Sequence, residues 1–168
     1  GKMSAFWIGE GDLDEFQKKA VGGMGADASF LLTGPAGSGK TNILLLRSKW
    51  LKLKNISNFK IVVFTATLKE FFQHGCAQYN IPGDYAVTAM QLFRDLLAEY
   101  SLECDSTGNF EEDRTLLAGI LKSFITDNKI HNIFEALLID EAQDYSDTEL
   151  FIFRALAERL IIAADSRQ

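Results

Sequence analysis

The stretch that decides the fold is Gly34-Pro35-Ala36-Gly37-Ser38-Gly39-Lys40-Thr41, which matches the phosphate-binding pattern G-x-x-x-x-G-K-[ST]. An apolar run at residues 28–32 precedes it and predicts a buried strand, and residues 42–51 follow it with a helical pattern. Glycines in such a loop let the backbone wrap a phosphate, because side chains there would block its approach. The strand, loop and helix therefore predict a P-loop with a nucleotide site.

Each part of this loop has an expected role. Lys40 should reach the β- and γ-phosphates of ATP, and the Thr41 hydroxyl should bind Mg²⁺. The loop itself, with the N-terminus of the following helix, should direct partial positive charge at the anion. The expected cofactor-binding residues of the loop are Gly34, Pro35, Ala36, Gly37, Ser38, Gly39, Lys40 and Thr41.

The bulk composition is that of a globular domain. The chain has 168 residues, of which 47% are hydrophobic, and its net charge is −6. This length predicts a single domain, and the acidic balance argues against a nucleic-acid binder that relies on a global basic field. There is no apolar run long enough to span a membrane. The two cysteines form no C-x-x-C pair and fit a reducing compartment, so we expect a cytoplasmic protein. We also expect the chain to be monomeric.

Apolar runs alternate with amphipathic segments along the chain, which predicts an α/β fold with a mostly parallel sheet covered by helices on both faces. The expected strands are residues 28–33, 60–65, 85–88, 136–140 and 160–164. The expected helices are residues 13–22, 40–54, 68–79, 90–100, 113–128 and 146–158. The chain stops just after the last expected strand, which suggests a fragment of a larger protein.

A second acidic element complements the P-loop. Residues 137–141 form an apolar strand that ends in Asp140 and Glu141. Ligands of open α/β sheets bind at this edge, so Asp140 should help to hold Mg²⁺ and Glu141 should accept a proton from the attacking water. Alternatively, the two acids are solvated and cap the next helix. No arginine is an obvious candidate for the cation that such sites usually receive in trans, so the chain would hold only half of a catalytic site.

The acidic strand end also carries a resemblance to a known family. The segment Asp140-Glu141-Ala142-Gln143-Asp144 resembles motif II of superfamily 1 helicases of the UvrD/Rep type. Other segments resemble further motifs of that family in the same order, namely the Q motif at residues 13–21, motif Ia at 62–68, motif Ib at 87–92 and motif III at 164–168. The resemblance covers nearly the whole chain, and it implies that residues 1–168 form a single domain, the first RecA-like domain of that family.

This resemblance implies a role for several residues. Gln17 would read adenine, although a glutamine on the polar face of an early helix can also be merely solvated. Gln143 and Gln168 would couple the γ-phosphate to the nucleic-acid side. Single-stranded DNA, or alternatively RNA, would contact Phe64, Thr65 and Thr88. Core packing is an equally good interpretation of Phe64. A second RecA-like domain of the parent protein would supply the missing arginine.

The segments also depart from the family pattern in places. Ala164 replaces the usual glycine of motif III, and Ala89-Met90-Gln91 replaces the usual Phe-His-Ser of motif Ib. These departures leave three hypotheses open. The chain is the ATP-hydrolysing domain of a helicase or translocase, a P-loop ATPase that regulates or remodels protein partners, or a non-catalytic interaction module.

Overall fold

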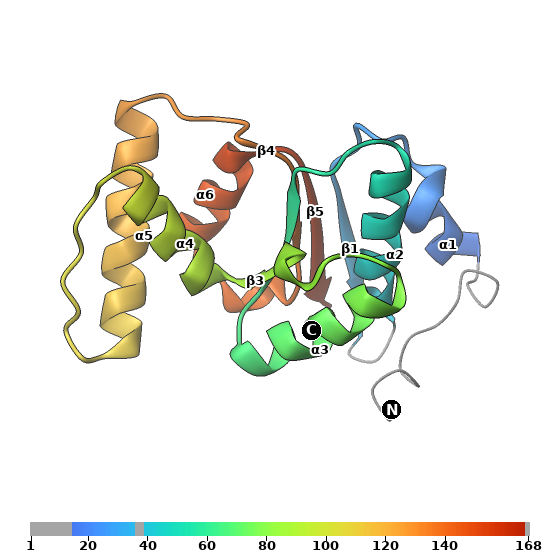
Figure 1. Cartoon of the computed structure of the whole chain (residues 1–168), viewed down its shortest axis with the longest axis horizontal. Helices are drawn as coiled ribbons and strands as arrows, with labels where there is room; N and C mark the ends of the chain where they lie inside the picture. Colours follow the sequence, from blue (N-terminus) through green and yellow to red (C-terminus); the bar gives the residue numbers. More distant parts are fainter. Residues whose placement is uncertain (1–14, 36–38, 167–168) are drawn as a thin grey trace.

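The computed structural model describes residues 15–35 and 39–166, which form a parallel five-stranded sheet between two layers of helices (Figure 1). The strands are β1 (Phe30–Gly34), β2 (Phe59–Val63), β3 (Ala86–Thr88), β4 (Phe134–Ile139) and β5 (Ala157–Asp165). Their order in the sheet is β1-β5-β4-β2-β3, and every pair is parallel. The predicted α/β fold of the P-loop type is thereby confirmed, and the strand order, which the sequence leaves open, is established.

The helices divide between the two faces of the sheet. They are α1 (Glu15–Lys18), α2 (Lys40–Leu53), α3 (Ala66–Gln78), α4 (Ala89–Glu99), α5 (Phe110–Asp127) and α6 (Asp147–Leu156), with the π-helix η3 (Lys19–Gly23) and the 3₁₀ turns η4 (Gly83–Tyr85) and η5 (Ala142–Asp144). Helices α2 and α3 and the π-helix bury one face, whereas α4, α5 and α6 bury the other. Figure 1 shows α4, α5 and α6 to the left of the sheet and α1 and α2 to its right.

Successive strand residues contribute to opposite layers of the core. In β2, Ile61 and Val63 pack on the α2 side while Val62 packs on the α5 side. In β4, Leu138 joins the first layer and Leu137 the second, and all five of these side chains are fully buried. Side chains alternate across a strand, so a strand covered on both faces must be apolar throughout. This explains why the strands appear in the sequence as continuous apolar runs.

Side chains cap the starts of α3, α4 and α6, whereas α2 begins after Gly39 without a side-chain cap. Thr65 accepts a hydrogen bond from the backbone N–H of Leu68 at 3.1 Å and starts α3, and Thr88 does the same for α4 with the N–H of Gln91. Ser146 and Glu149 form a reciprocal capping box at α6. Such side chains satisfy backbone donors that have no partner within the helix. They fix the points at which the chain leaves the carboxyl edge of the sheet.

Most element boundaries differ from the expected ones by a few residues, as three elements illustrate. The described part of the helix expected over residues 13–22 continues from α1 into the π-helix η3. Helix α5 begins at Phe110, because Asn109 caps it by accepting from the N–H of Glu112. The helix expected over residues 146–158 ends at Leu156, and β5 starts at Ala157.

The early start of β5 follows from the contacts of Arg159. Its guanidinium donates to the carbonyl oxygen of Glu135 at 2.8 Å and pairs with Asp27 at 2.9 Å. Ala157 lies opposite Phe134 in the parallel ladder. Tertiary partners therefore override the local charged pattern of Glu158-Arg159, which by itself favours a helix.

A buried arginine fastens the segment before β1 to helix α2. Arg47 is fully buried and donates to the carbonyl oxygens of Val21, Met24 and Gly25 at 3.0, 2.9 and 2.7 Å. Its guanidinium also lies 4.3 Å from the ring centre of Trp50. Burial, together with the charge of Arg159, lowers the pKa of Arg47 to about 10, so it is still a cation at neutral pH. The Arg47 side chain thus donates hydrogen bonds to three backbone carbonyl oxygens of the segment that precedes β1.

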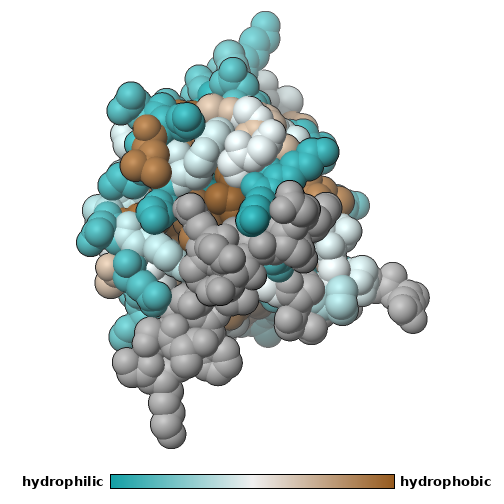
Figure 2. Space-filling model, turned by 90° about the vertical axis from the view of Figure 1, so that its right-hand side faces the viewer, coloured by the Kyte–Doolittle hydropathy of each residue, from teal (hydrophilic) through white to brown (hydrophobic). Residues whose placement is uncertain are grey.

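Figure 2 shows the side of the molecule that carries α1 and α2. On the part of this face that the structure describes, hydrophilic side chains surround a few separate hydrophobic ones. Leu53, at the end of α2, is one exposed hydrophobic residue, with 69% of its surface accessible. Strand β1 is an edge strand of the sheet.

We predict that Arg47→Met lowers the free energy of unfolding by roughly 3 kcal/mol, because the buried guanidinium loses its hydrogen bonds to the carbonyl oxygens of Val21, Met24 and Gly25. Urea denaturation at neutral pH measures the change. The control is Arg94→Met, which removes an exposed arginine from α4. Equal stability of the two variants would contradict the fastening role of Arg47.

Candidate functional site

The carboxyl edge of the sheet gathers most of the predicted site residues. Gly34 lies opposite Asp165 in the β1–β5 register, and the N–H of Ser166 donates to the carbonyl oxygen of Gly34 at 3.0 Å. Asp140 follows β4 directly, and its N–H donates to the carbonyl oxygen of Val62 at 3.0 Å. Helix α2 follows β1 and packs on one face of the sheet, whereas α6 follows β4 and packs on the other. Ligands of open α/β sheets bind at such a carboxyl edge, which makes this edge the candidate site. Ala36, Gly37, Ser38 and Gln168 lie outside the described residues.

Gly39 meets a requirement that only glycine satisfies easily. Its φ is +87°, in the left-handed region, and it immediately precedes α2. A Cβ at this position would lie 3.3 Å from Nε2 of Gln17. The side chain of Gln17 thus lies beside the P-loop, as the adenine-reading prediction requires, although the contact itself does not test that role.

Three contacts hold the Lys40 side chain at the carboxyl edge of the sheet. Its ammonium donates to the carbonyl oxygens of Gly34 at 2.7 Å and Pro35 at 2.9 Å, and it pairs with Oδ1 of Asp165 at 3.0 Å. The residue is 9% exposed. Sequence analysis assigned no role to Asp165. The signal that could have found Asp165 is its place in the segment that resembles motif III, at the end of β5. Its contact with Lys40 depends on the position of β5 in the sheet, which the sequence leaves open.

The side chains of Thr41 and Asp140 contact each other at this edge. The Thr41 hydroxyl donates to Oδ2 of Asp140 over a long 3.4 Å, and Asp140 is 2% exposed. Burial, and secondly the charge of Glu141, raise the pKa of Asp140 to about 7, against the opposing effects of the Glu141 backbone, Thr41 and Lys40. A buried carboxylate that lacks full charge compensation is a good ligand for a hard cation.

These residues fit Mg²⁺ and a nucleotide phosphate. Thr41 and Asp140 offer the oxygen donors that Mg²⁺ prefers, with coordination positions left for phosphate and water. Gly39 permits the backbone to approach an anion, and Lys40 supplies a positive charge. In residues 15–35 and 39–166, this site included, no group of three or more His, Cys, Asp or Glu side chains could hold a metal ion.

Glu141 and Gln143 follow Asp140 at the same edge of the sheet. Glu141 adopts the left-handed backbone conformation, with φ of 52°, which is uncommon for a residue with a side chain. The amide of Gln143 donates to the Glu141 carboxylate, and its Oε1 accepts from the N–H of Asp165 at 3.1 Å. Gln143 therefore connects the predicted general base to the end of β5, which also contacts Lys40.

The predicted nucleic-acid residues share this edge of the sheet. Thr65 lies just after β2 and Thr88 is the last residue of β3, and each caps the helix that follows. Phe64 is half-buried, with its ring centre 5.7 Å from that of Tyr145 and 4.7 Å from the guanidinium of Arg114. Core packing of Phe64 is thus observed, while contact of these three residues with nucleic acid stays a prediction.

Sequence analysis missed an ion pair beside this edge. Arg114 of α5 pairs with Glu149 of α6, which is buried. The two residues are 35 positions apart and belong to no motif, so only the packing of α5 against α6 reveals the pair.

Comparisons with known proteins support a nucleotide-binding site. A family model described as an AAA domain matches residues 24–166. No curated protein matches the chain. In the described residues, no helix is both long and apolar enough to cross a membrane.

We predict that Asp140→Asn stabilises the protein, and more strongly as pH rises. The folded pKa near 7 exceeds the ordinary value of 3.8, so the parent loses stability as Asp140 ionises on going from about pH 4 to pH 7. A neutral asparagine avoids this loss, which amounts to a few kcal/mol at most. Urea unfolding in EDTA at pH 4.5 and pH 8 measures it, with Asp144→Asn as the control. A difference from the parent that is equal at both pH values would refute the effect.

Proposed function

The chain belongs to the AAA domain family, and from this premise we propose that it is the ATP-binding and ATP-hydrolysing domain of a superfamily 1 DNA helicase or translocase. The family makes it a nucleotide-binding P-loop ATPase domain. The observation that carries the finer proposal is the position of Gln143, between the Glu141 carboxylate and the backbone of Asp165. An ATPase that moves on a strand must link its hydrolytic residue to another part of the fold, and this side chain does so directly.

Each site residue has a part in this proposal. Residues 34–41 bind the phosphates, with Lys40 on the β- and γ-phosphates, and Gln17 contacts adenine. Thr41 and Asp140 would hold Mg²⁺, which when bound neutralises charge on the phosphate oxygens. Glu141 accepts the proton of the attacking water.

Coupling to the strand completes the proposed mechanism. Gln143 and Gln168 respond to the γ-phosphate, and single-stranded DNA lies across the edge that carries Phe64, Thr65 and Thr88. The support for this placement is that all three residues lie at the ends of β2 and β3. A second RecA-like domain of the parent protein supplies an arginine to the γ-phosphate.

A second candidate is a P-loop ATPase that acts on protein partners. The net charge of −6 favours it, because a nucleic-acid motor generally needs a basic surface. The replacement of the usual motif Ib residues by Ala89-Met90-Gln91 points the same way. RNA in place of DNA is a variant of the first candidate.

Variants of Lys40 and Glu141 should separate nucleotide binding from ATP hydrolysis. We predict that Lys40→Ala weakens ATP binding at least tenfold, because the phosphates lose a buried cation. Glu141→Gln should retain ATP affinity within about twofold but lose at least 100-fold in turnover, because the amide accepts no proton. Fluorescent-nucleotide titration and phosphate release measure the two quantities. Parental turnover in Glu141→Gln would mean that another group acts as the base.

The strand partner is tested by ATP hydrolysis in the longest native form of the protein. We predict that single-stranded DNA raises the rate of ATP turnover at least tenfold, because DNA bound to Phe64, Thr65 and Thr88 would order the segment that carries Glu141. Single-stranded RNA and double-stranded DNA serve as comparisons. Turnover indifferent to every nucleic acid would favour the protein-directed ATPase, and nucleotide binding without turnover would favour a non-catalytic module.

A further inference from the structure

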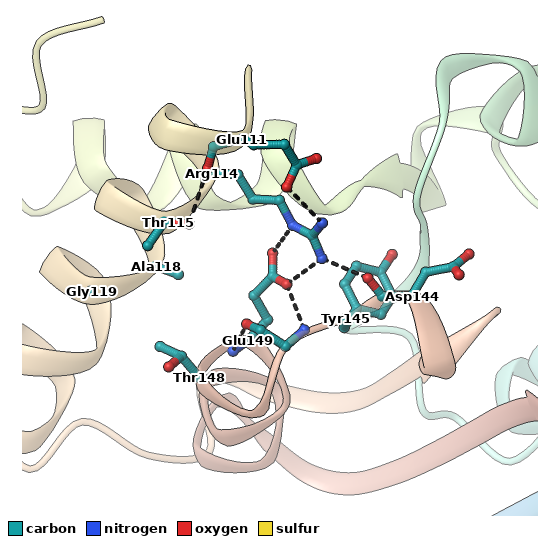
Figure 3. A pocket seen from close by; sticks show the side chains of 10 residues that line it. Glu111, Arg114, Thr115, Ala118, Gly119, Asp144, Tyr145, Thr148 and Glu149 are labelled. Atoms are coloured by element: carbon teal, nitrogen blue, oxygen red, sulfur yellow. Dashed lines mark hydrogen bonds and ion pairs between the residues drawn. The ribbon is translucent and has the colours of Figure 1, made fainter. Parts of the chain in front are cut away.

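We propose that Arg114 is a positioning residue for the segment that carries Glu141 and Gln143. Arg114 lies on α5, outside every motif of the chain, and its side chain is 14% exposed. Its Nε and Nη2 donate to the two carboxylate oxygens of Glu149 at 2.9 and 2.6 Å, a bidentate pair (Figure 3). Such a pair fixes the plane of the guanidinium as well as its position. This inference rests on the proposed hydrolytic role of Glu141.

A further contact turns this ion pair into a clamp on the η5 turn. Nη2 of Arg114 also donates to the backbone carbonyl oxygen of Asp144 at 2.6 Å. Figure 3 shows the guanidinium between Glu149 on one side and Asp144 on the other. Asp144 follows Gln143 directly, so the clamp acts one residue away from the side chain that bonds to Glu141.

The η5 turn is stiff enough to transmit this constraint. The N–H of Asp144 donates to the carbonyl oxygen of Glu141 at 2.9 Å, and the N–H of Tyr145 donates to that of Ala142 at 3.2 Å. The turn is attached to β4 at its start and held by Arg114 at its end. Glu141 adopts a left-handed conformation within it, which persists only where the surroundings hold it.

Glu149 is held in turn by α6. Its Oε1 accepts from the N–H of Ser146 at 2.8 Å, and the Ser146 hydroxyl accepts from the N–H of Glu149 at 3.2 Å. The carboxylate is 2% exposed, so its orientation is fixed by protein contacts. Arg114 thus connects α5, the start of α6 and the η5 turn, and its guanidinium also covers the ring of Phe64.

The site of the clamp is open on one side. A hollow of about 500 Å³ between α5 and α6 is lined by Arg114, Glu149, Asp144 and Tyr145 (Figure 3). Lysine could not replace Arg114 here, because an ammonium lacks the planar fork that serves Glu149 and the Asp144 carbonyl together. The geometry therefore assigns to Arg114 the orientation of the Glu141 segment without contact with the nucleotide.

The test uses a variant designed to keep the fold. Removing Arg114 alone would leave the buried Glu149 carboxylate without its cation, which endangers folding. The double variant Arg114→Met with Glu149→Gln removes both charges and keeps an oxygen that can accept from Ser146, but nothing donates to the Asp144 carbonyl. Arg154→Met, which removes an exposed arginine from α6, is the control.

Two readouts are measured on the longest native form of the protein. In the double variant we expect kcat for ATP to fall at least tenfold with KM within twofold of the parent, since misplacement of a catalytic group costs turnover and not binding. Amide hydrogen exchange should accelerate at least tenfold in residues 141–146 and be unchanged in residues 134–139. The Arg154→Met control should match the parent in both.

Other outcomes overturn the inference. Parental kcat, or parental exchange in residues 141–146, shows that Arg114 does not position the segment. Faster exchange throughout β4 and α6 shows a general structural role instead. Glu141→Gln, measured in parallel, keeps this result separate from the proposed function: if it hydrolyses ATP like the parent, the assigned base is wrong, and the exchange of residues 141–146 alone then decides whether Arg114 holds the turn.

Discussion

The insertion of β5 between β1 and β4 is the constraint on which the rest of the site depends. Parallel pairing on both sides of β5 fixes its carboxyl end between the P-loop and the acidic strand. Asp165 thereby reaches the ammonium of Lys40 with its side chain and the amide of Gln143 with its backbone. A sheet in which β1 and β4 were neighbours would bring the same motifs together without this intermediate. The contacts among the three strand ends are therefore a property of the strand order.

Burial of charge is the second theme of the molecule. Arg47, Asp140 and Glu149 are each almost wholly removed from solvent, and each is satisfied differently. Arg47 has carbonyl oxygens around it, Glu149 has Arg114, and Asp140 has the distant hydroxyl of Thr41, with a pKa raised by burial. Among the described residues, the Nε of Arg47 has no hydrogen-bond partner, so incomplete partnering by itself does not mark a ligand site. Asp140 differs from the other two because it lies beside Thr41 of the P-loop, where a bound cation would compensate its charge.

The sequence predicted the features that depend on local pattern. The P-loop, the acidic strand end and the alternation of strands and helices follow from spacing and hydrophobicity. Strand order, the partner of Lys40 and the Arg114–Glu149 pair depend on contacts between residues far apart in the chain, for which one sequence carries no signal. Helix ends were displaced where a cap such as Asn109, or a tertiary partner such as those of Arg159, decides the boundary. The role of each site residue in binding and hydrolysis is still a prediction.

The contacts of Lys40 have a consequence for how any measured nucleotide affinity is interpreted. Its ammonium already has the carbonyl oxygens of Gly34 and Pro35 and the carboxylate of Asp165 as partners. The arrival of a phosphate is therefore an exchange reaction, in which old contacts are given up as new ones form, and not a simple addition. A dissociation constant reports only the difference between the two sets of contacts. A modest overall affinity would consequently be compatible with a strong individual bond between Lys40 and the phosphate.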